Sequence, residues 1–202
     1  MSRFLAVCFV LVLFSTEVFP QKALPVKQLP EICLTQTEIE LYRLINEYRA
    51  QKGLPGIKLS TSLCYVARSH AKDQAENFKK GTRCNMHSWS KKGDWSSCCY
   101  TPDHKKAKCM WDKPRELTNY QGDGFEISFF SSYIYTSPAA FAKDILDGWK
   151  KSPNHNNVIM NKNIWKKINW QAIGIGIYGD YADVWFGKEE DSAGGPQPCD
   201  KE

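Results

Sequence analysis

The sequence predicts an α+β fold built around an antiparallel sheet. The order of its patterns supports this class, because helical periodicity comes first, a mixture follows, and strand-like segments come last. The final segments, residues 171–178 and 182–187, read as a hairpin that turns through Gly179-Asp180. A doubly wound parallel sheet would instead alternate strands and helices along the chain.

Two helices are expected in the amino-terminal half. The motif Thr-Gln-Thr-Glu at 35–38 fits a capping box, so the first helix should begin there and end before Gly53. Its apolar residues follow at helical spacing: Leu41, Leu44, Ile45 and Tyr48. The second helix should begin at Ser60 or Thr61 and stop near Gly81.

An irregular middle separates these helices from the regular second half. Residues 82–123 hold four cysteines, and a loop this long is usually functional or cross-linked; cross-linking is the simpler account. Residues 125–131 read as a strand and 138–149 as a third helix. Ser152-Pro153 then suggests the cap and first residue of another short helical turn.

The amino end predicts secretion. Residues 4–14 are an unbroken apolar run after Arg3, which suits a signal peptide and is too short to span a bilayer. Cleavage is expected between Ser15 and Ala23, and no later stretch could form a transmembrane anchor. The expected organisation is a signal peptide at 1–20, an extended lead-in at 21–34, one domain at 35–187 and a flexible tail at 188–202.

Seven cysteines remain once Cys8 leaves with the signal: Cys33, Cys64, Cys84, Cys98, Cys99, Cys109 and Cys199. In an oxidising compartment most should pair, and the odd number leaves one free, modified or joined to another chain. Adjacent Cys98 and Cys99 should each pair elsewhere, because a ring closed between neighbours is strained.

The net charge of +5 does not indicate nucleic-acid binding, because the charges are scattered. The nearest thing to a basic run, Lys105, Lys106 and Lys108, is interpreted as a solvated loop.

Four histidines are candidate functional groups. His70 in the second helix and His104 in the lysine-rich loop are interpreted as ordinary structural or surface residues. His87 follows a helix beside a cysteine, and His155 lies in the first turn of a short helix. Because a helix amino end disfavours imidazolium, His155 should be neutral, as metal coordination or neutral hydrogen bonding requires.

Several motifs in order resemble the CAP superfamily of cysteine-rich secretory, antigen 5 and pathogenesis-related 1 proteins. The resemblance covers about residues 35–187. It is carried by Asn46-x-x-Arg49, Gly53-Leu54-Pro55, His87-Ser88, Gly124-Phe125-Glu126-Ile127, Trp149-x-x-Ser152-Pro153-x-His155, Ile173-Gly174-Ile175-Gly176 and Val184-Trp185-Phe186-Gly187.

The resemblance implies a three-layer α-β-α sandwich with a central antiparallel sheet and an SCP-type cleft. That cleft gathers two histidines and two acids, and in some members it binds Zn²⁺ or another divalent ion. The matching residues are His87, His155 and Glu126, with His87 and His155 as the expected metal ligands. Ser152 occupies the place of the second acid, so the set is incomplete. The alternative is a polar cleft in which histidine and glutamate hydrogen-bond each other without a metal.

The resemblance also implies binding rather than catalysis, since CAP-type proteins are generally not established enzymes. The expected function is a secreted module that takes a small apolar ligand, such as a sterol or fatty acid, or an extracellular protein partner. A metal-assisted extracellular hydrolase, acting on peptides or esters through His87, His155 and Glu126, is the alternative.

Overall fold

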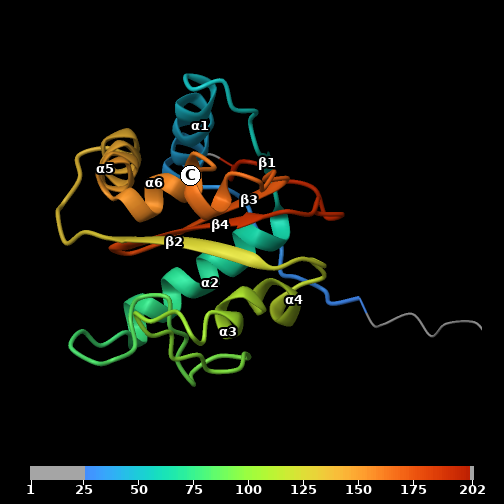
Figure 1. The fold of residues 1–202 in the computed structure, drawn as a ribbon, viewed down its shortest axis with the longest axis vertical. Coiled ribbons are helices and arrows are strands. Elements are labelled where there is room, and N and C mark those ends of the chain that lie inside the picture. The colour runs from blue at the N-terminus through green and yellow to red at the C-terminus, as the bar shows by residue number, and fades with distance from the viewer. Residues whose placement is uncertain (1–25, 201–202) are drawn as a thin grey trace, which may run out of the picture.

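The structure, a computed structural model, describes residues 26–200 and contains one four-stranded sheet (Figure 1). The strand order is β1-β3-β4-β2, so β2 lies at one edge. The strands are β1 (Lys58–Leu59), β2 (Gly124–Phe130), β3 (Ala172–Tyr178) and β4 (Tyr181–Gly187). The long strands pair antiparallel, and only the two-residue β1 pairs parallel with β3. The proposed signal peptide lies outside the described residues.

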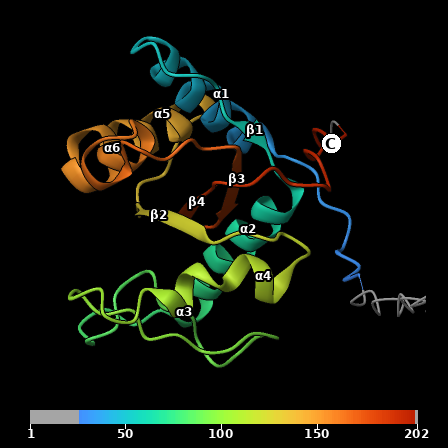
Figure 2. The same cartoon turned by 45° about the vertical axis from the view of Figure 1, so that its right-hand side comes forward.

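Helices cover both faces of this sheet, as the two views show (Figures 1 and 2). One layer contains α1 (Gln36–Ala50), α5 (Pro138–Lys151), α6 (Pro153–Ile159) and the 3-10 turn η1 (Asn163–Trp165). The opposite layer contains α2 (Thr61–Asn77), α3 (Lys108–Trp111) and α4 (Lys113–Leu117). The expected α-β-α sandwich with an antiparallel sheet is therefore confirmed.

Local sequence signals set most element boundaries. The Thr35 hydroxyl accepts a hydrogen bond from the Glu38 amide, and the Glu38 carboxylate accepts from the Thr35 amide, which completes the predicted capping box. Ser60 caps α2 with a single bond, because its hydroxyl accepts a hydrogen bond from the Leu63 amide. The helix expected to stop near Gly81 ends earlier, at Asn77, because the chain turns extended at Phe78.

The two faces of the sheet pack differently. The α1/α5 face carries branched and aromatic side chains that form the main core, including Ile127, Ile175 and Val184. On the α2 face, Gly174 and Gly176 leave room for helix backbone. A Cβ added at Gly174 would lie 2.1 Å from the Leu63 carbonyl carbon. Glycine therefore permits α2 to pack directly on β3.

Three disulfides join Cys33 to Cys199, Cys84 to Cys99 and Cys98 to Cys109. The expectation that the two adjacent cysteines pair separately is confirmed. Cys64, in α2, is the free cysteine of the described chain and is buried.

The segment after Gly187, expected as a flexible tail, returns to the start of the domain. Its Cys199 is bonded to Cys33; the Leu34 amide donates a hydrogen bond to the Gln197 carbonyl, and the Cys199 amide donates one to the Leu34 carbonyl. Across residues 26–200, no helix combines the length and apolar character needed to cross a bilayer.

Candidate functional site

Glu126 lies at the centre of the candidate site. Its strand β2 forms one edge of the sheet, and its side chain points to the same face as its β4 neighbour Trp185. Both carboxylate oxygens face imidazoles. Oε1 contacts Nδ1 of His70, and Oε2 lies 2.7 Å from Nδ1 of His87. The edge strand thus holds one carboxylate between two histidines.

His70 is the inner histidine, fully buried at the middle of α2. Its Nε2 lies 3.0 Å from the Ser88 carbonyl oxygen, which can only accept, so Nε2 carries a proton. Its ring stacks on Trp89 with centroids 4.3 Å apart. Burial lowers the pKa of His70, but the charges of Glu126 and Asp183 outweigh it and raise that pKa to about 9. At neutral pH, His70 is therefore an imidazolium.

The two acids beside His70 differ in the direction of their pKa shifts. Burial raises the pKa of Glu126, but the His70 charge and the hydrogen bonds from His70 and His87 lower it to about 2. Burial and the Glu126 charge raise the pKa of Asp183 well above its usual value. The difference follows from distance, because Glu126 is in direct contact with both histidines whereas Asp183 Oδ2 lies 3.7 Å from His70 Nδ1.

His87 is the outer histidine, and its side chain is 22% exposed. Its Nδ1 faces Glu126, and its ring meets Tyr100 edge-on. Its Nε2 makes no hydrogen bond within residues 26–200, so this nitrogen remains available to a ligand.

His155 lies in the first turn of α6. Burial lowers the pKa of His155 to about 4, the charge of His87 lowers it further, and the charge of Glu126 opposes the shift. The neutral imidazole matches the expectation, but burial rather than the helix end is the largest cause. No described hydrogen bond joins His155 to His87 or Glu126, so the charges of these two residues reach it only through space.

Ser152 stands between α5 and α6, as the sequence indicated. It is the amino-terminal cap residue of α6 by backbone position, but its hydroxyl makes no capping hydrogen bond. No described hydrogen bond links Ser152 to His87, Glu126 or His155. The position that would hold a second acid thus contributes neither a charge nor a hydrogen bond to these three.

The interpretation of His70 as an ordinary structural histidine missed its contact with Glu126. The available signal was its place on the apolar stripe of α2. Its neighbours on that stripe are all buried: Leu63, Val66, Ala67, Ala71 and Gln74. A histidine at helical spacing within such a stripe requires a buried partner.

His70, Glu126 and Asp183 could hold a metal ion by composition, since ligand atoms of the three lie within 4.8 Å of one another. Their arrangement does not fit one. Both His70 nitrogens are engaged, whereas metal ligands must offer free lone pairs, and the raised pKa of Asp183 makes its carboxyl group harder to deprotonate. The expected set of His87, His155 and Glu126 does not bring its ligand atoms within that distance of one another in residues 26–200.

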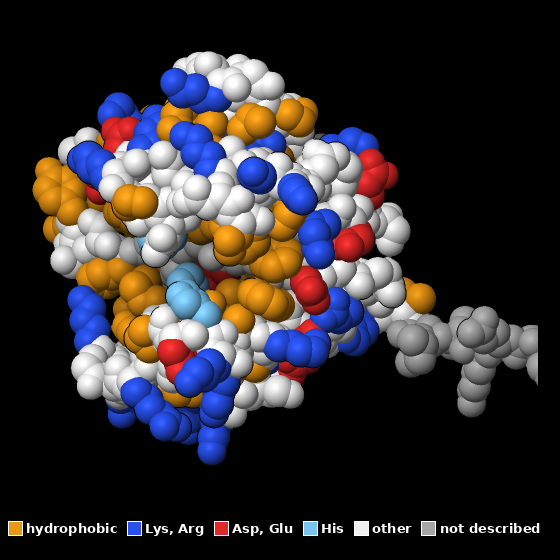
Figure 3. All heavy atoms as spheres, in the orientation of Figure 1, with side chains coloured by type: hydrophobic (Ala, Val, Ile, Leu, Met, Phe, Trp, Pro, Cys, Tyr) orange, Lys and Arg blue, Asp and Glu red, His pale blue; other side chains and the backbone are white. Residues whose placement is uncertain are grey.

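An aromatic cluster lies at the start of β2, where the Phe125 side chain points to the opposite face of the sheet from its neighbour Glu126. Phe125 lies at its centre, with ring centroids 5.4 Å from Trp111 of α3 and 5.2 Å from Trp165 of η1. These tryptophans come from opposite helical layers. The space-filling view shows histidine side chains within a hollow flanked by hydrophobic ones (Figure 3). The site is therefore polar at its centre and apolar around it.

Together these features define an α-β-α sandwich with a histidine–glutamate cluster at its edge strand. The family model described as the cysteine-rich secretory protein family, CAP, matches residues 42–186. The chain belongs to this family. A comparison with curated proteins finds no match.

The chain is similar to solved structures at low identity. The chain is 18% identical to an outer surface protein from Borrelia burgdorferi, with a TM-score of 0.50, over 77% of this chain and 94% of that one. A cysteine-rich secretory protein from Staphylococcus aureus is 16% identical, with a TM-score of 0.48, over 76% of this chain and 38% of that one. An extracellular SCP-domain protein from Bacillus anthracis is 17% identical, with a TM-score of 0.49 and coverages of 76% and 40%. The match thus spans less than half the length of the latter two.

Proposed function

We propose that this protein is an extracellular binding module whose cleft takes a small apolar ligand with one polar group, such as a sterol or fatty acid. The observation that carries the proposal is the hollow of Figure 3, in which histidine side chains lie among hydrophobic ones. On the opposite face of the edge strand β2, Phe125 packs between Trp111 and Trp165.

The charges of the cleft favour a ligand with little charge of its own. His155 is neutral, and the Glu126 charge is offset by His70. The free nitrogen of His87 could hydrogen-bond a hydroxyl or carbonyl group. Apolar pockets with a few convergent polar groups are the usual design of small-molecule sites, because the apolar walls supply affinity and the polar groups fix orientation.

An extracellular location is part of the proposal. It is supported by the apolar run at 4–14 and by three disulfides, which persist in oxidising compartments. The names of two similar structures, an extracellular protein and an outer surface protein, agree with it. Expression with the native amino end should release the protein into the medium, and retention in the cell would contradict this location.

The ligand proposal is tested with radiolabelled cholesterol and palmitate in an equilibrium binding assay. Saturable uptake of either is expected, with Trp165→Ala weakening it about tenfold, since a buried aromatic contact contributes on the order of 1–2 kcal/mol. Tyr133→Ala is the matched control, because Tyr133 is 70% exposed and lies outside the aromatic cluster. No saturable uptake, or equal losses in both variants, would overturn the proposal.

A further inference from the structure

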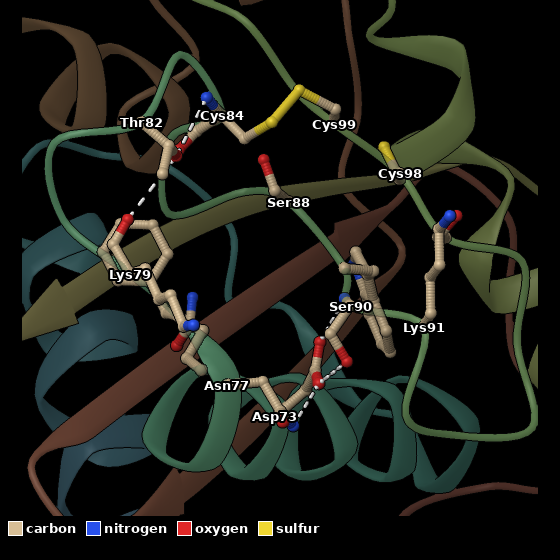
Figure 4. A pocket seen from close by; sticks show the side chains of 14 residues that line it. Asp73, Asn77, Lys79, Thr82, Cys84, Ser88, Ser90, Lys91, Cys98 and Cys99 are labelled. Atoms are coloured by element: carbon tan, nitrogen blue, oxygen red, sulfur yellow. Dashed lines mark hydrogen bonds between the residues drawn. A yellow bond between two sulfur atoms is a disulfide. The ribbon is translucent and has the colours of Figure 1, made fainter.

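A second cavity lies between the carboxyl end of α2 and the cysteine-rich segment (Figure 4). Its volume is about 300 Å³, within the range of small-molecule sites. Its polar lining includes Asp73, Gln74 and Asn77 from one face of α2. None of Glu126, His87 and His155 borders it, so it is distinct from the cleft described above.

Asp73 is the notable group in this cavity. It is 3% exposed. Its carboxylate accepts hydrogen bonds from the Ser90 amide at 2.7 Å, the Ser90 hydroxyl at 2.5 Å and the Asn77 amide nitrogen at 2.9 Å. All three donors are neutral, and no cationic side chain of residues 26–200 lies within ion-pair distance of it. Asp73 is thus a buried carboxylate without a counter-ion, which is costly unless a cation is supplied.

The hydrogen-bonding capacity around Asp73 is also incomplete. A carboxylate offers about four lone-pair sites, and three donors are present. The neighbouring Gln74 is 1% exposed, and its Nε2 donates to the Met86 carbonyl, the Ser128 hydroxyl and the Asp183 carboxylate. Asp73 is an acceptor, so a ligand that satisfies it must donate a hydrogen bond.

The rest of the cavity wall is largely apolar. Phe78, Trp89 and the Cys84–Cys99 disulfide line it, and Figure 4 shows that disulfide across the cavity from Asp73. Lys79 and Lys91 lie on opposite sides of the cavity and are exposed. Their charges are therefore screened by solvent more strongly than that of Asp73.

We propose that this cavity binds a small organic cation, a primary ammonium or guanidinium on an apolar body, with Asp73 as its counter-ion. The ammonium donates to Asp73, and the apolar body packs on Phe78 and the disulfide. The cation is carried either by a free amine or by a lysine or arginine side chain of another protein. This inference does not depend on the function proposed for the cleft.

The test is calorimetric titration of the full secreted chain at pH 7 with 2-phenylethylamine, and with neutral 2-phenylethanol and anionic 3-phenylpropanoate as matched probes. The amine should bind saturably and at least about tenfold more tightly than the alcohol, as expected for a charge-assisted hydrogen bond worth roughly 1.5–3 kcal/mol. Equal binding of amine and alcohol, or preferential binding of the anion, would overturn the proposal.

Asp73→Asn should weaken amine binding about tenfold or more, because it removes the charge and keeps the shape. Asp94→Asn, an exposed position of the same segment, should change nothing. Near-ultraviolet circular dichroism shows whether the Asp73 variant folds. If it does not fold, the comparison of amine and alcohol binding to the wild-type protein still tests the proposal. An unchanged affinity in a folded Asp73→Asn variant would exclude this carboxylate as the counter-ion.

A titration with N-acetyl-lysine methylamide separates the two sources of the cation. Tighter binding of this probe than of 2-phenylethylamine assigns the cavity to a protein side chain, and the reverse order assigns it to a free amine. Failure of both amines to bind would exclude the proposal.

Discussion

The two faces of the central sheet are built from alternate residues of the same strands, yet one is apolar whereas the other combines a second apolar cluster with buried charged groups. In β2, Phe125 and Ile127 join the apolar core on one face, while Glu126 and Ser128 point to the other. In β4, Val184 faces the core and its neighbour Asp183 faces α2. One face stabilises the fold by burying apolar surface, and the other buries polar groups that must be satisfied individually.

The two faces should differ in how much stability a substitution removes. An apolar face tolerates changes that keep volume, because dispersion and burial are spread over many contacts. The α2 face depends on a few paired charges and on glycines that permit close approach. Substitutions on the α2 face should therefore lower the free energy of unfolding more, for each atom changed, than substitutions on the apolar face.

The largest effect is expected for Glu126→Gln. This change removes the carboxylate in direct contact with His70 and leaves only Asp183, whose Oδ2 lies 3.7 Å from His70 Nδ1, which should lower the free energy of unfolding by about 3 kcal/mol. Urea unfolding followed by tryptophan fluorescence measures it. Glu47→Gln is the control, since the Glu47 ion pair with Arg43 is half exposed and should contribute almost nothing. A loss below about 1 kcal/mol for Glu126→Gln would show that His70 is not charged in the fold.

The next effect is expected for Gly174→Ala on the α2 face. The new Cβ would meet the Leu63 backbone at 2.1 Å, so α2 must move, at a cost of roughly 2–3 kcal/mol. Gly56→Ala is the control, because its nearest contact is 3.6 Å away, an ordinary packing distance. Comparable unfolding midpoints for the two variants would contradict the close packing of α2 on β3.

A smaller effect should follow from pH. The pKa of His70 rises to about 9 on folding, so its stabilising contribution is complete below about pH 6.5 and is lost as pH rises through 9. The pKa of His155 falls to about 4, so its contribution is present above about pH 6.5 and is lost as pH falls through 4.

Stability should therefore be greatest near neutral to slightly acidic pH, and fall by about 1–2 kcal/mol toward pH 9. Thermal unfolding between pH 4 and 9 measures this profile. In His70→Gln the decline on the alkaline side should disappear, while His155→Gln should remove part of the decline on the acidic side. If stability still declines at alkaline pH in His70→Gln, the decline is caused by the titration of another group and the prediction for His70 is wrong.

The smallest effect is expected on the apolar face. Ile175→Val removes one methylene from the core, which should cost about 1 kcal/mol. The same urea titration detects it. A cost equal to that of Gly174→Ala, its neighbour on the opposite face, would remove the distinction between the two faces.

Local signals predicted the elements well. The Thr35–Glu38 capping box and the Gly179-Asp180 hairpin are specified within a few residues, so the sequence suffices to place them. Glu126 and His87 were recognised through motifs. Their mutual hydrogen bond followed from neither periodicity nor spacing, because the two residues come from a strand and an irregular loop.

The contacts of His70 with Glu126 and Asp183 could not be predicted from local signals. His70 contacts Glu126 across 56 residues, and Asp183 comes from the closing hairpin. Such partners meet only when the sheet order is fixed, and no local pattern encodes that order. The cavity beside Asp73 is hidden for the same reason, since it exists only after disulfides have folded the cysteine-rich segment over α2.

Cys64 has a consequence for oxidative folding. In the folded domain its side chain is buried against β3, and burial raises the pKa of its thiol to about 12, so it is inert toward thiol–disulfide exchange. Before α2 packs on the sheet, the same thiol is exposed and competes with six cysteines that must find correct partners. The order of events therefore matters to the yield of native protein: a core that forms before oxidation hides the competitor, whereas early oxidation traps it in mispaired chains.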